Sequence, residues 1–225
     1  MGPSLEKLVV ALSGYTEAER SDAVEDLQQL KDREGIPYLV VALHDRSVRV
    51  REAAVRALID LGGADVADAA AALLGSENVG MRNGAIEILE ELGESALLPL
   101  ERYLMSTSAD VRKFSIDTVG KIISQIKATP STLSLLVDRL WDSNENVAGA
   151  AAEALGGTRD DTAVSFLVDR ISASCESSWL QCSIVAVLAD IESAASMDAL
   201  QQIRRMQLSA EAKTFLDSAL SGAAL

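Results

Sequence analysis

Very few side chains in this sequence have the chemistry of catalysis or metal binding. The single histidine, His44, precedes Asp45, and the two cysteines are Cys175 and Cys182. A centre with several imidazole ligands needs more than one histidine. A cysteine nucleophile needs a base or a group of positive charges that lowers its pKa, and neither cysteine has one nearby in the sequence. We therefore expect no catalytic residue, no metal site and no cofactor.

These residues have ordinary structural interpretations instead. We expect His44 to be a solvated turn residue. Cys175 and Cys182 fall seven residues apart in what reads as one helix, about 10 Å along its axis, which is too far for a disulfide. We expect both thiols to be reduced and to serve in packing.

The composition bounds the fold and the partners. The chain has 225 residues, of which 48% are hydrophobic and only 4% aromatic, with Ala, Leu and Val dominant, and this favours closely packed helices. Its formal net charge of −14, without a cluster of Lys and Arg, opposes binding to nucleic acid or to an anionic membrane. No apolar run approaches the roughly 20 residues that span a bilayer, and the N-terminal apolar segment is too short for a signal peptide. We expect a cytoplasmic protein.

A nine-residue pattern recurs with a period of about 32 residues. Clear copies begin at Val50 (VREAAVRAL), Met81, Val111, Val147 and Leu180, and weaker copies begin at Glu19 and Ala212. A fixed period between about 20 and 50 residues is typical of stacked supersecondary units. A further amphipathic segment precedes each copy, as in residues 35–45, 95–105 and 131–142. The pattern therefore predicts two antiparallel helices in each repeat.

Glycines and polar turns place the repeat boundaries. Gly62, Gly63, Gly93, Gly156 and Gly157 follow second helices, where a residue with positive φ commonly ends a helix. The polar turns HDRS, GSEN, STSAD and DSNEN supply capping residues for the helix that follows. We expect a single domain with repeats of about 4–34, 35–63, 64–93, 94–128, 129–157, 158–192 and 193–225.

The motif V-R-x-x-A-x-x-x-L-G, whole or in part, begins at Val50, Met81, Val111 and Val147. In this it resembles the HEAT family of helical repeats, in the short bacterial form related to phycobilisome-lyase repeats. The resemblance covers nearly the whole chain. It implies an all-α fold, a right-handed α-α superhelix or armadillo-like solenoid of about seven antiparallel helix pairs, with second helices lining the concave side. The end copies depart from the motif, as capping repeats do.

Acidic residues recur on the expected concave face. At 100° per residue, positions 2, 6 and 9 after the motif start point away from the packed side of the helix. Position 6 is occupied by Glu25, Arg56, Glu87, Asp117, Glu153 and Ala186. We predict that Glu25, Glu87, Asp117 and Glu153 bind a basic or amphipathic partner segment. The alternative is that they are solvated polar positions on an acidic protein.

The C-terminal half of this face becomes smoother. Positions 2, 6 and 9 are Gly149, Glu153 and Gly156 in one repeat and Cys182, Ala186 and Ala189 in the next. This predicts a shallow apolar trough that accepts a partner helix, with Trp141 and Trp179 near its edge as interface anchors. The alternative is that both tryptophans pack between neighbouring repeats.

Arginine follows the motif start in four repeats, as Arg20, Arg51, Arg82 and Arg112. An anion site is one interpretation. The family resemblance favours a structural ladder in which the guanidinium groups pair with turn acids such as Asp45 and Asp110.

The prediction for function is a non-enzymatic scaffold or adaptor that binds a peptide or helix of another protein on its concave face. The resemblance leaves two alternatives open. One is a phycobilin lyase or lyase subunit that acts on a tetrapyrrole-carrying protein, and the other is an adaptor in bacterial signal transduction.

Overall fold

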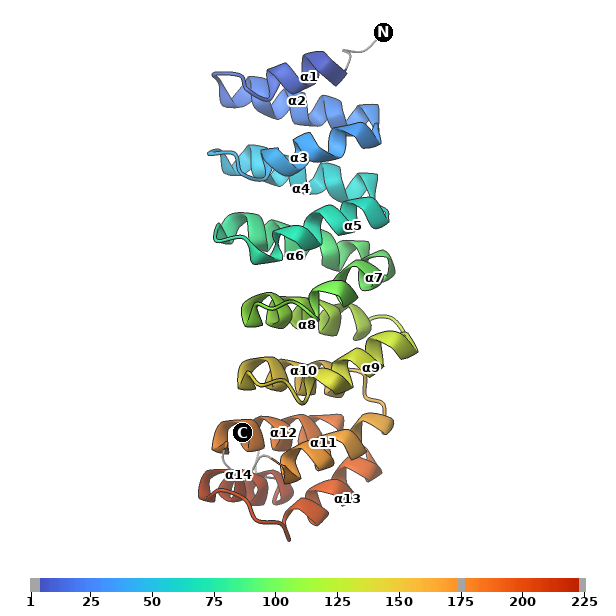
Figure 1. Ribbon diagram of the computed structural model, residues 1–225, viewed down its shortest axis with the longest axis vertical. Coiled ribbons are helices and arrows are strands. Elements are labelled where there is room, and N and C mark those ends of the chain that lie inside the picture. The colour runs from blue at the N-terminus through green and yellow to red at the C-terminus, as the bar shows by residue number, and fades with distance from the viewer. Residues whose placement is uncertain (1–4, 174–176, 223–225) are drawn as a thin grey trace. The chain divides into compact units, whose positions relative to one another are not determined.

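A computed structural model describes residues 5–173 and 177–222 of the chain (Figure 1). Within these residues it contains fourteen α-helices, two short 3-10 helices and no strand, so the predicted all-α repeat fold is confirmed. The chain divides into two compact units, Met1–Tyr103 and Leu104–Leu225. No helix in the described part of the chain is long and apolar enough to cross a membrane.

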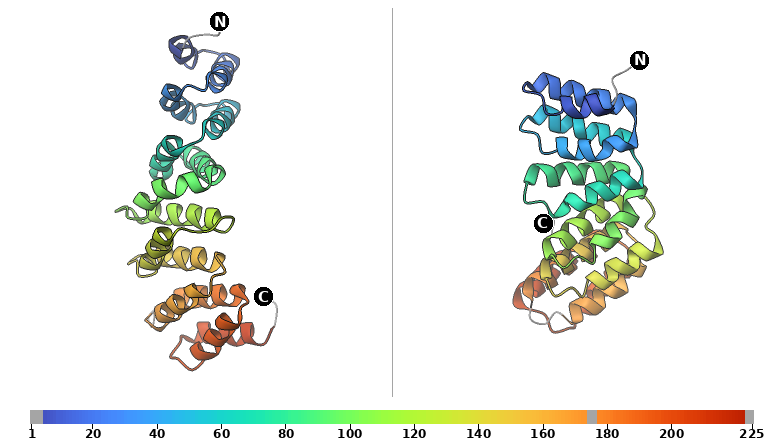
Figure 2. Two further views of the ribbon diagram at one scale, coloured as in Figure 1. Left: turned by 90° about the vertical axis from the view of Figure 1, so that its right-hand side faces the viewer. Right: turned by 45° about the horizontal axis from the view of Figure 1, so that its top comes forward.

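The first unit holds seven α-helices in two rows (Figures 1 and 2). One row contains the first helices of the repeats and the other contains the second helices, and each second helix packs against the next. The first helices are α1 (Leu5–Ala11), α3 (Ile36–Ala42), α5 (Ala64–Ala71) and α7 (Glu94–Tyr103). The second helices are α2 (Glu17–Leu30), α4 (Val48–Leu61) and α6 (Val79–Leu92), and the 3-10 helices are η1 (Arg33–Gly35) and η2 (Ala72–Gly75).

The second unit has the same two rows. Its second helices are α8 (Ala109–Ile123), α10 (Glu145–Gly157), α12 (Ser178–Ile191) and α14 (Ala210–Leu220), and each packs against the next. Its first helices are α9 (Pro130–Arg139), α11 (Thr162–Ser172) and α13 (Ala194–Ile203). The fourteen described helices match the number expected for seven pairs, and the unit boundary falls between α7 and α8.

Motif positions 4 and 8 form the interior between second helices. In the first unit, position 4 is alanine and position 8 is leucine in every copy, and all six side chains are buried. They are Ala23, Ala54 and Ala85, with Leu27, Leu58 and Leu89. Alanine keeps the helix axes close because it adds little bulk, and leucine fills the space between them. This is why the motif repeats: each helix must present the same surface to both neighbours.

Glycine ends two of the second helices as predicted. Gly62 follows α4 with φ 61° and Gly93 follows α6 with φ 55°. The helix α10 also ends at a predicted glycine, Gly157, but the predicted positive φ is wrong for Gly156 and Gly157 and belongs to Arg159. Close contact with the next second helix, described below, explains the glycine at position 156.

The motif arginines tie each turn to its own helix. Arg51 donates to the Asp45 carbonyl and Arg82 to the Ser76 carbonyl, both at 2.7 Å. Arg112 donates to the Ser106 carbonyl at 2.8 Å. A guanidinium with several donors can satisfy these turn carbonyls, which would otherwise lack a partner.

Two motif arginines also hold the turn of the following repeat. Arg20 donates through two nitrogens to Asp45, at 2.6 and 2.9 Å, and Arg112 donates in the same way to Asp142, at 2.7 Å twice. The partner of Arg112 is therefore Asp142 and not Asp110, which lies exposed in the first turn of α8. Asp45 and Asp142 occupy the same turn position, two residues before the N-cap, and serine replaces them at Ser76 and Ser106. Each of these arginines therefore pairs with the aspartate that its side chain can reach in the turn of the following repeat, and not with an acid that is near it in the sequence.

Both aspartates accept further hydrogen bonds that favour their charged form. Arg20 lowers the pKa of Asp45, and the Ser47 amide adds to this effect. Burial raises the pKa of Asp142, but hydrogen bonds from Arg112 and the Asn144 amide outweigh burial, and the pKa is lowered overall. These pairs therefore stabilise the fold while the aspartates are ionised.

Asp142→Ala should lower the free energy of unfolding by about 2 kcal/mol, because Arg112 would keep a largely buried charge without its carboxylate. Because the folded pKa of Asp142 is lowered, its contribution is present above the unfolded pKa of about 4 and is lost as the pH falls through the folded value. Urea unfolding at neutral and acidic pH measures both effects. The control is Asp217→Ala, which breaks the exposed pair with Arg204 and should cost less than about 0.5 kcal/mol. Equal losses for the two variants would contradict this assignment.

Candidate functional site

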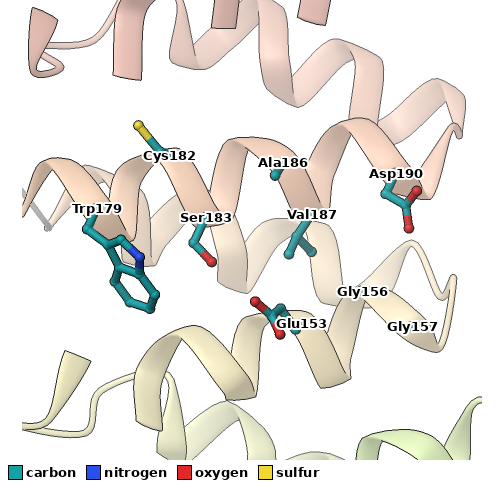
Figure 3. Close-up of a pocket in the computed structure, with 9 residues that line it drawn as sticks. All are labelled: Glu153, Gly156, Gly157, Trp179, Cys182, Ser183, Ala186, Val187 and Asp190. Atoms are coloured by element: carbon teal, nitrogen blue, oxygen red, sulfur yellow. The ribbon is translucent and has the colours of Figure 1, made fainter. Parts of the chain in front are cut away.

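A cavity of about 560 Å³ lies between α10 and α12 in the second unit (Figure 3). We call it the α10–α12 groove, and it lies where the sequence predicts a shallow trough. From α12 it is lined by Trp179, Cys182, Ser183, Ala186, Val187 and Asp190, and from α10 by Glu153, Gly156 and Gly157. The groove therefore combines one aromatic ring, two carboxylates and a floor of small or aliphatic residues.

Two glycines in α10 let α12 approach closely. A Cβ atom at Gly149 would lie 2.5 Å from Cη2 and 2.9 Å from Cζ3 of Trp179. A Cβ atom at Gly156 would overlap Cγ1 of Val187. A side chain at either position would therefore force its neighbour in α12 to shift, and the spacing of seven residues puts both contacts on one face of α10.

Trp179 forms one end of the groove. Ser177 caps α12 by accepting a hydrogen bond from the Leu180 amide, which fixes the start of the helix one residue before Trp179. The indole extends toward α10 (Figure 3). It lies against Gly149, yet 49% of the residue remains exposed. The ring of Trp179 is thus packed against α10, while about half of the residue remains accessible to solvent.

Glu153 and Asp190 bring negative charge to the groove. Both are exposed, and the Glu153 carboxylate points from α10 toward α12 (Figure 3). Within the described residues neither carboxylate has an ion pair. Their charge is therefore available to a ligand and has no role in packing.

Cys182 is a poor nucleophile in this setting. Burial raises the pKa of its thiol, and the negative charge of Glu211 raises it further. The half-buried sulfur also points away from α10 (Figure 3). At neutral pH the thiol therefore stays protonated, and Cys182 acts as a wall of the groove.

A protein-family model that describes HEAT repeats matches this chain at residues 5–90 and 68–156. These ranges together cover more than half of the sequence. The chain belongs to the HEAT repeat family. No curated protein matches it significantly in sequence.

Solved structures resemble this HEAT repeat chain at low sequence identity. A mutant of Kap121p is 12% identical with a TM-score of 0.62, over 96% of this chain and 28% of that one, and this likeness shows a shared helical repeat fold. Human deoxyhypusine hydroxylase in complex with glycerol is 16% identical with a TM-score of 0.46, over 98% of this chain and 85% of that one. The complex of CpcE and CpcF of phycocyanin lyase from Nostoc sp. PCC7120 is 19% identical with a TM-score of 0.49, over 69% of this chain and 99% of that one.

The structure places the predicted acidic residues of the HEAT repeats on second helices with their side chains at least partly exposed. Glu25 in α2 and Glu87 in α6 are exposed in the first unit. In the second unit Asp117 in α8 is half-buried and accepts a salt bridge from Lys113 at 2.7 Å, while Glu153 faces the groove. Glu153 meets another predicted site residue, Trp179, at the α10–α12 groove.

The remaining predicted residues lie apart from the groove. Trp141 is in the turn after α9, 55% exposed, with the Arg170 guanidinium 5.3 Å from its ring centroid, and it does not line the groove. His44 is exposed in the turn before α4, with Nδ1 3.1 Å from both Asn78 Nδ2 and Met81 Sδ. The part of the chain that the structure describes contains no cluster of ligands that could hold a metal ion. Cys175 lies outside the described residues.

The sequence interpretation missed Ser183, Val187 and Asp190. These residues occupy motif positions 3, 7 and 10, whereas the prediction rested on positions 2, 6 and 9. The signal was present in α12, because Trp179 and Asp190 are eleven residues apart and therefore share one helix face. A helical wheel that started at the tryptophan would have found the second carboxylate.

Gly156→Ala should destabilise the second unit by about 1 to 3 kcal/mol, because the added methyl group overlaps Val187. Gly157→Ala is the matched control: it lies in the same helix, and a methyl group added there would have no neighbouring atom within 4 Å. This control should be neutral or stabilising by up to about 1 kcal/mol. Urea unfolding monitored by circular dichroism measures both. In a double-mutant cycle, Gly156→Ala should cost less free energy in the Val187→Ala background than in the original chain, and an equal cost in both backgrounds would contradict the close contact.

Proposed function

We propose that this HEAT repeat chain is a non-enzymatic scaffold that binds a peptide or helix of another protein on the face formed by its second helices. The main contact is the α10–α12 groove. The observation that carries the proposal is the exposed ring of Trp179 beside a cavity whose two carboxylates have no ion pair in the described chain. Tryptophan is enriched among the residues that dominate binding energy at protein interfaces.

Rigid placement of the groove supports this function. Its walls are two helices that pack against each other, and α10 and α12 also pack against α8 and α14. Little conformational entropy is lost when a ligand binds a surface that is already ordered. A partner segment can therefore be held by modest contacts, with the ring of Trp179 as the largest.

The other predicted contact residues extend the proposed surface. Glu25 and Glu87 add negative charge to the second-helix face of the first unit, and Asp117 adds it in the second. Trp141 offers an exposed ring at the turn between α9 and α10. Exposed charges of this kind affect the rate and specificity of association more than the affinity. We propose them as secondary contacts, in a protein that acts in the cytoplasm.

Crosslinking tests which face binds a partner. A photo-reactive amino acid at exposed Ala186, inside the groove, should give a discrete adduct in cells of the source organism. The same amino acid at Ser165, exposed on the first helix α11, is the control and should not give that adduct. The captured protein is then identified, purified and used in a direct binding titration.

In that titration Trp179→Ala should raise the Kd by about thirtyfold, the effect expected for an interface tryptophan. Ala186→Lys should also weaken binding, because it adds bulk to the groove without removing a packed side chain. Phe166→Ala, at an exposed aromatic residue of α11, is the matched control and should leave the Kd within about twofold. Unchanged affinity in both groove variants would refute the proposed site.

The phycobilin lyase alternative stays a prediction from the family resemblance. Under the scaffold proposal, adding purified protein to a linear tetrapyrrole leaves the absorption spectrum of the tetrapyrrole unchanged, because no bilin-binding contact is proposed in the groove. A spectrophotometric titration checks this. A saturable spectral change that Ala186→Lys abolishes would favour the lyase alternative over the scaffold.

A further inference from the structure

The chemistry at the Trp179 end of the α10–α12 groove suits a cation. The exposed face of an indole attracts a guanidinium or ammonium group, and a nearby carboxylate adds an ion pair. Gly149 lies beneath the ring, and Glu153 follows Gly149 by one turn on the same face of α10. An arginine side chain can therefore stack on Trp179 and direct its donors to Glu153.

A second carboxylate lies further along the groove. The contact of Gly156 with Val187 aligns Glu153 of α10 with the level of residue 184 in α12. Asp190 is six residues beyond that level, so the two carboxylates are separated by about 9 Å along the helix direction. A helix that presents two basic residues seven positions apart on one face spaces them by about 10.5 Å, and the length of an arginine side chain covers the difference.

The stretch between the carboxylates is small and apolar. Gly156, Ala186 and Val187 line it. The cavity volume of about 560 Å³ exceeds the space that one side chain fills, so the groove has room for a short stretch of a partner. Apolar side chains between the two basic residues of a helix would rest on this floor, which is the usual way in which an amphipathic helix binds a groove.

Charge complementarity decides the occupant. The chain carries a formal net charge of −14, and the groove adds two carboxylates without a cation beside them in the described chain. An acidic or neutral helix would leave these carboxylates facing apolar groups or like charges, whereas a basic helix pairs with both.

We infer that the α10–α12 groove selects a partner helix with two basic residues seven positions apart, the first stacked on Trp179 beside Glu153 and the second at Asp190, with small apolar residues between them. This inference rests on the proposed scaffold function and specifies its ligand. It concerns the spacing of charge in the ligand, which the scaffold proposal leaves open.

Synthetic alanine-based helical peptides test the spacing. One peptide carries arginines seven positions apart with leucine between them, and a second has the same composition with arginines five positions apart, on opposite sides of the helix. Circular dichroism verifies that both are equally helical. The 225-residue chain carries Trp141→Phe, so that the remaining tryptophan, Trp179, reports binding through its fluorescence.

The peptide with the seven-residue spacing should change Trp179 emission saturably and bind about tenfold more tightly than its isomer, with an affinity that falls as salt is added. Glu153→Gln/Asp190→Asn should remove this preference. The control Asp138→Asn/Asp169→Asn makes the same change in net charge at exposed positions of the first helices α9 and α11, and it should retain the preference.

Equal binding of the two peptides would overturn the inference, because it would indicate general attraction to an acidic protein. Absence of binding to either peptide would also overturn it. Both results leave the scaffold proposal to its own test, the Trp179→Ala titration with the captured partner. Conversely, the captured partner could depend on Trp179 for binding but be insensitive to Glu153→Gln/Asp190→Asn. This result would support the scaffold proposal and refute the inferred spacing of basic residues in the ligand.

Discussion

Close packing between consecutive second helices is the constraint on which the rest of the structure depends. A second helix that lies between two others must fit two surfaces at once with its residues at motif positions 4 and 8. Ala54 and Leu58 do this in α4, between α2 and α6. A bulkier residue in place of Ala54 would separate these axes and open voids around the leucines. Position 4 is not alanine throughout: in the second unit it is Ser115, Ala151, Ile184 and Leu216, all buried, so α12 and α14 accommodate larger side chains there.

Hydrogen bonds in the turns add to the stability that packing of the interior provides. Helix packing fixes the distance between neighbouring repeats, but it leaves the turn backbone with carbonyl groups that need donors. The motif arginines supply these donors, and in two places, Asp45 and Asp142, a carboxylate fixes the same guanidinium from the next repeat. The energetic gain of such a partly buried pair depends on both members being present, because either one alone keeps a charge with reduced solvation. Packing and turn pairing together hold the start of each second helix in place.

The sequence predicted the parts of this structure that repeat. The all-α repeat fold and its helix pairs follow from a period of about 32 residues, because similar packing requires similar residues. Side-chain contacts between repeats were harder to predict. The aspartate paired with Arg112 is thirty residues away at Asp142, whereas Asp110 is near in sequence but exposed in α8. A periodic pattern predicts the spacing of the turns, but it does not predict which side chains form contacts between one turn and the next.

Gly156 shows the same limit and also why the groove is where it is. From sequence, a glycine pair at the end of a helical pattern indicates a terminus, and only the neighbouring helix reveals that Val187 occupies the space of a side chain. Glycine inside a helix costs about 1 kcal/mol relative to alanine. In α10 that cost is offset by apolar contact, because Gly149 and Gly156 receive Trp179 and Val187 against the helix backbone. The same two contacts leave Trp179 half exposed and place Glu153 between them, so the residues that bring α12 close to α10 also shape the groove. Stability and the proposed ligand contact therefore depend on the same interface, which is why variants at Ala186, Glu153 and Asp190, outside the packed contacts, can separate the two.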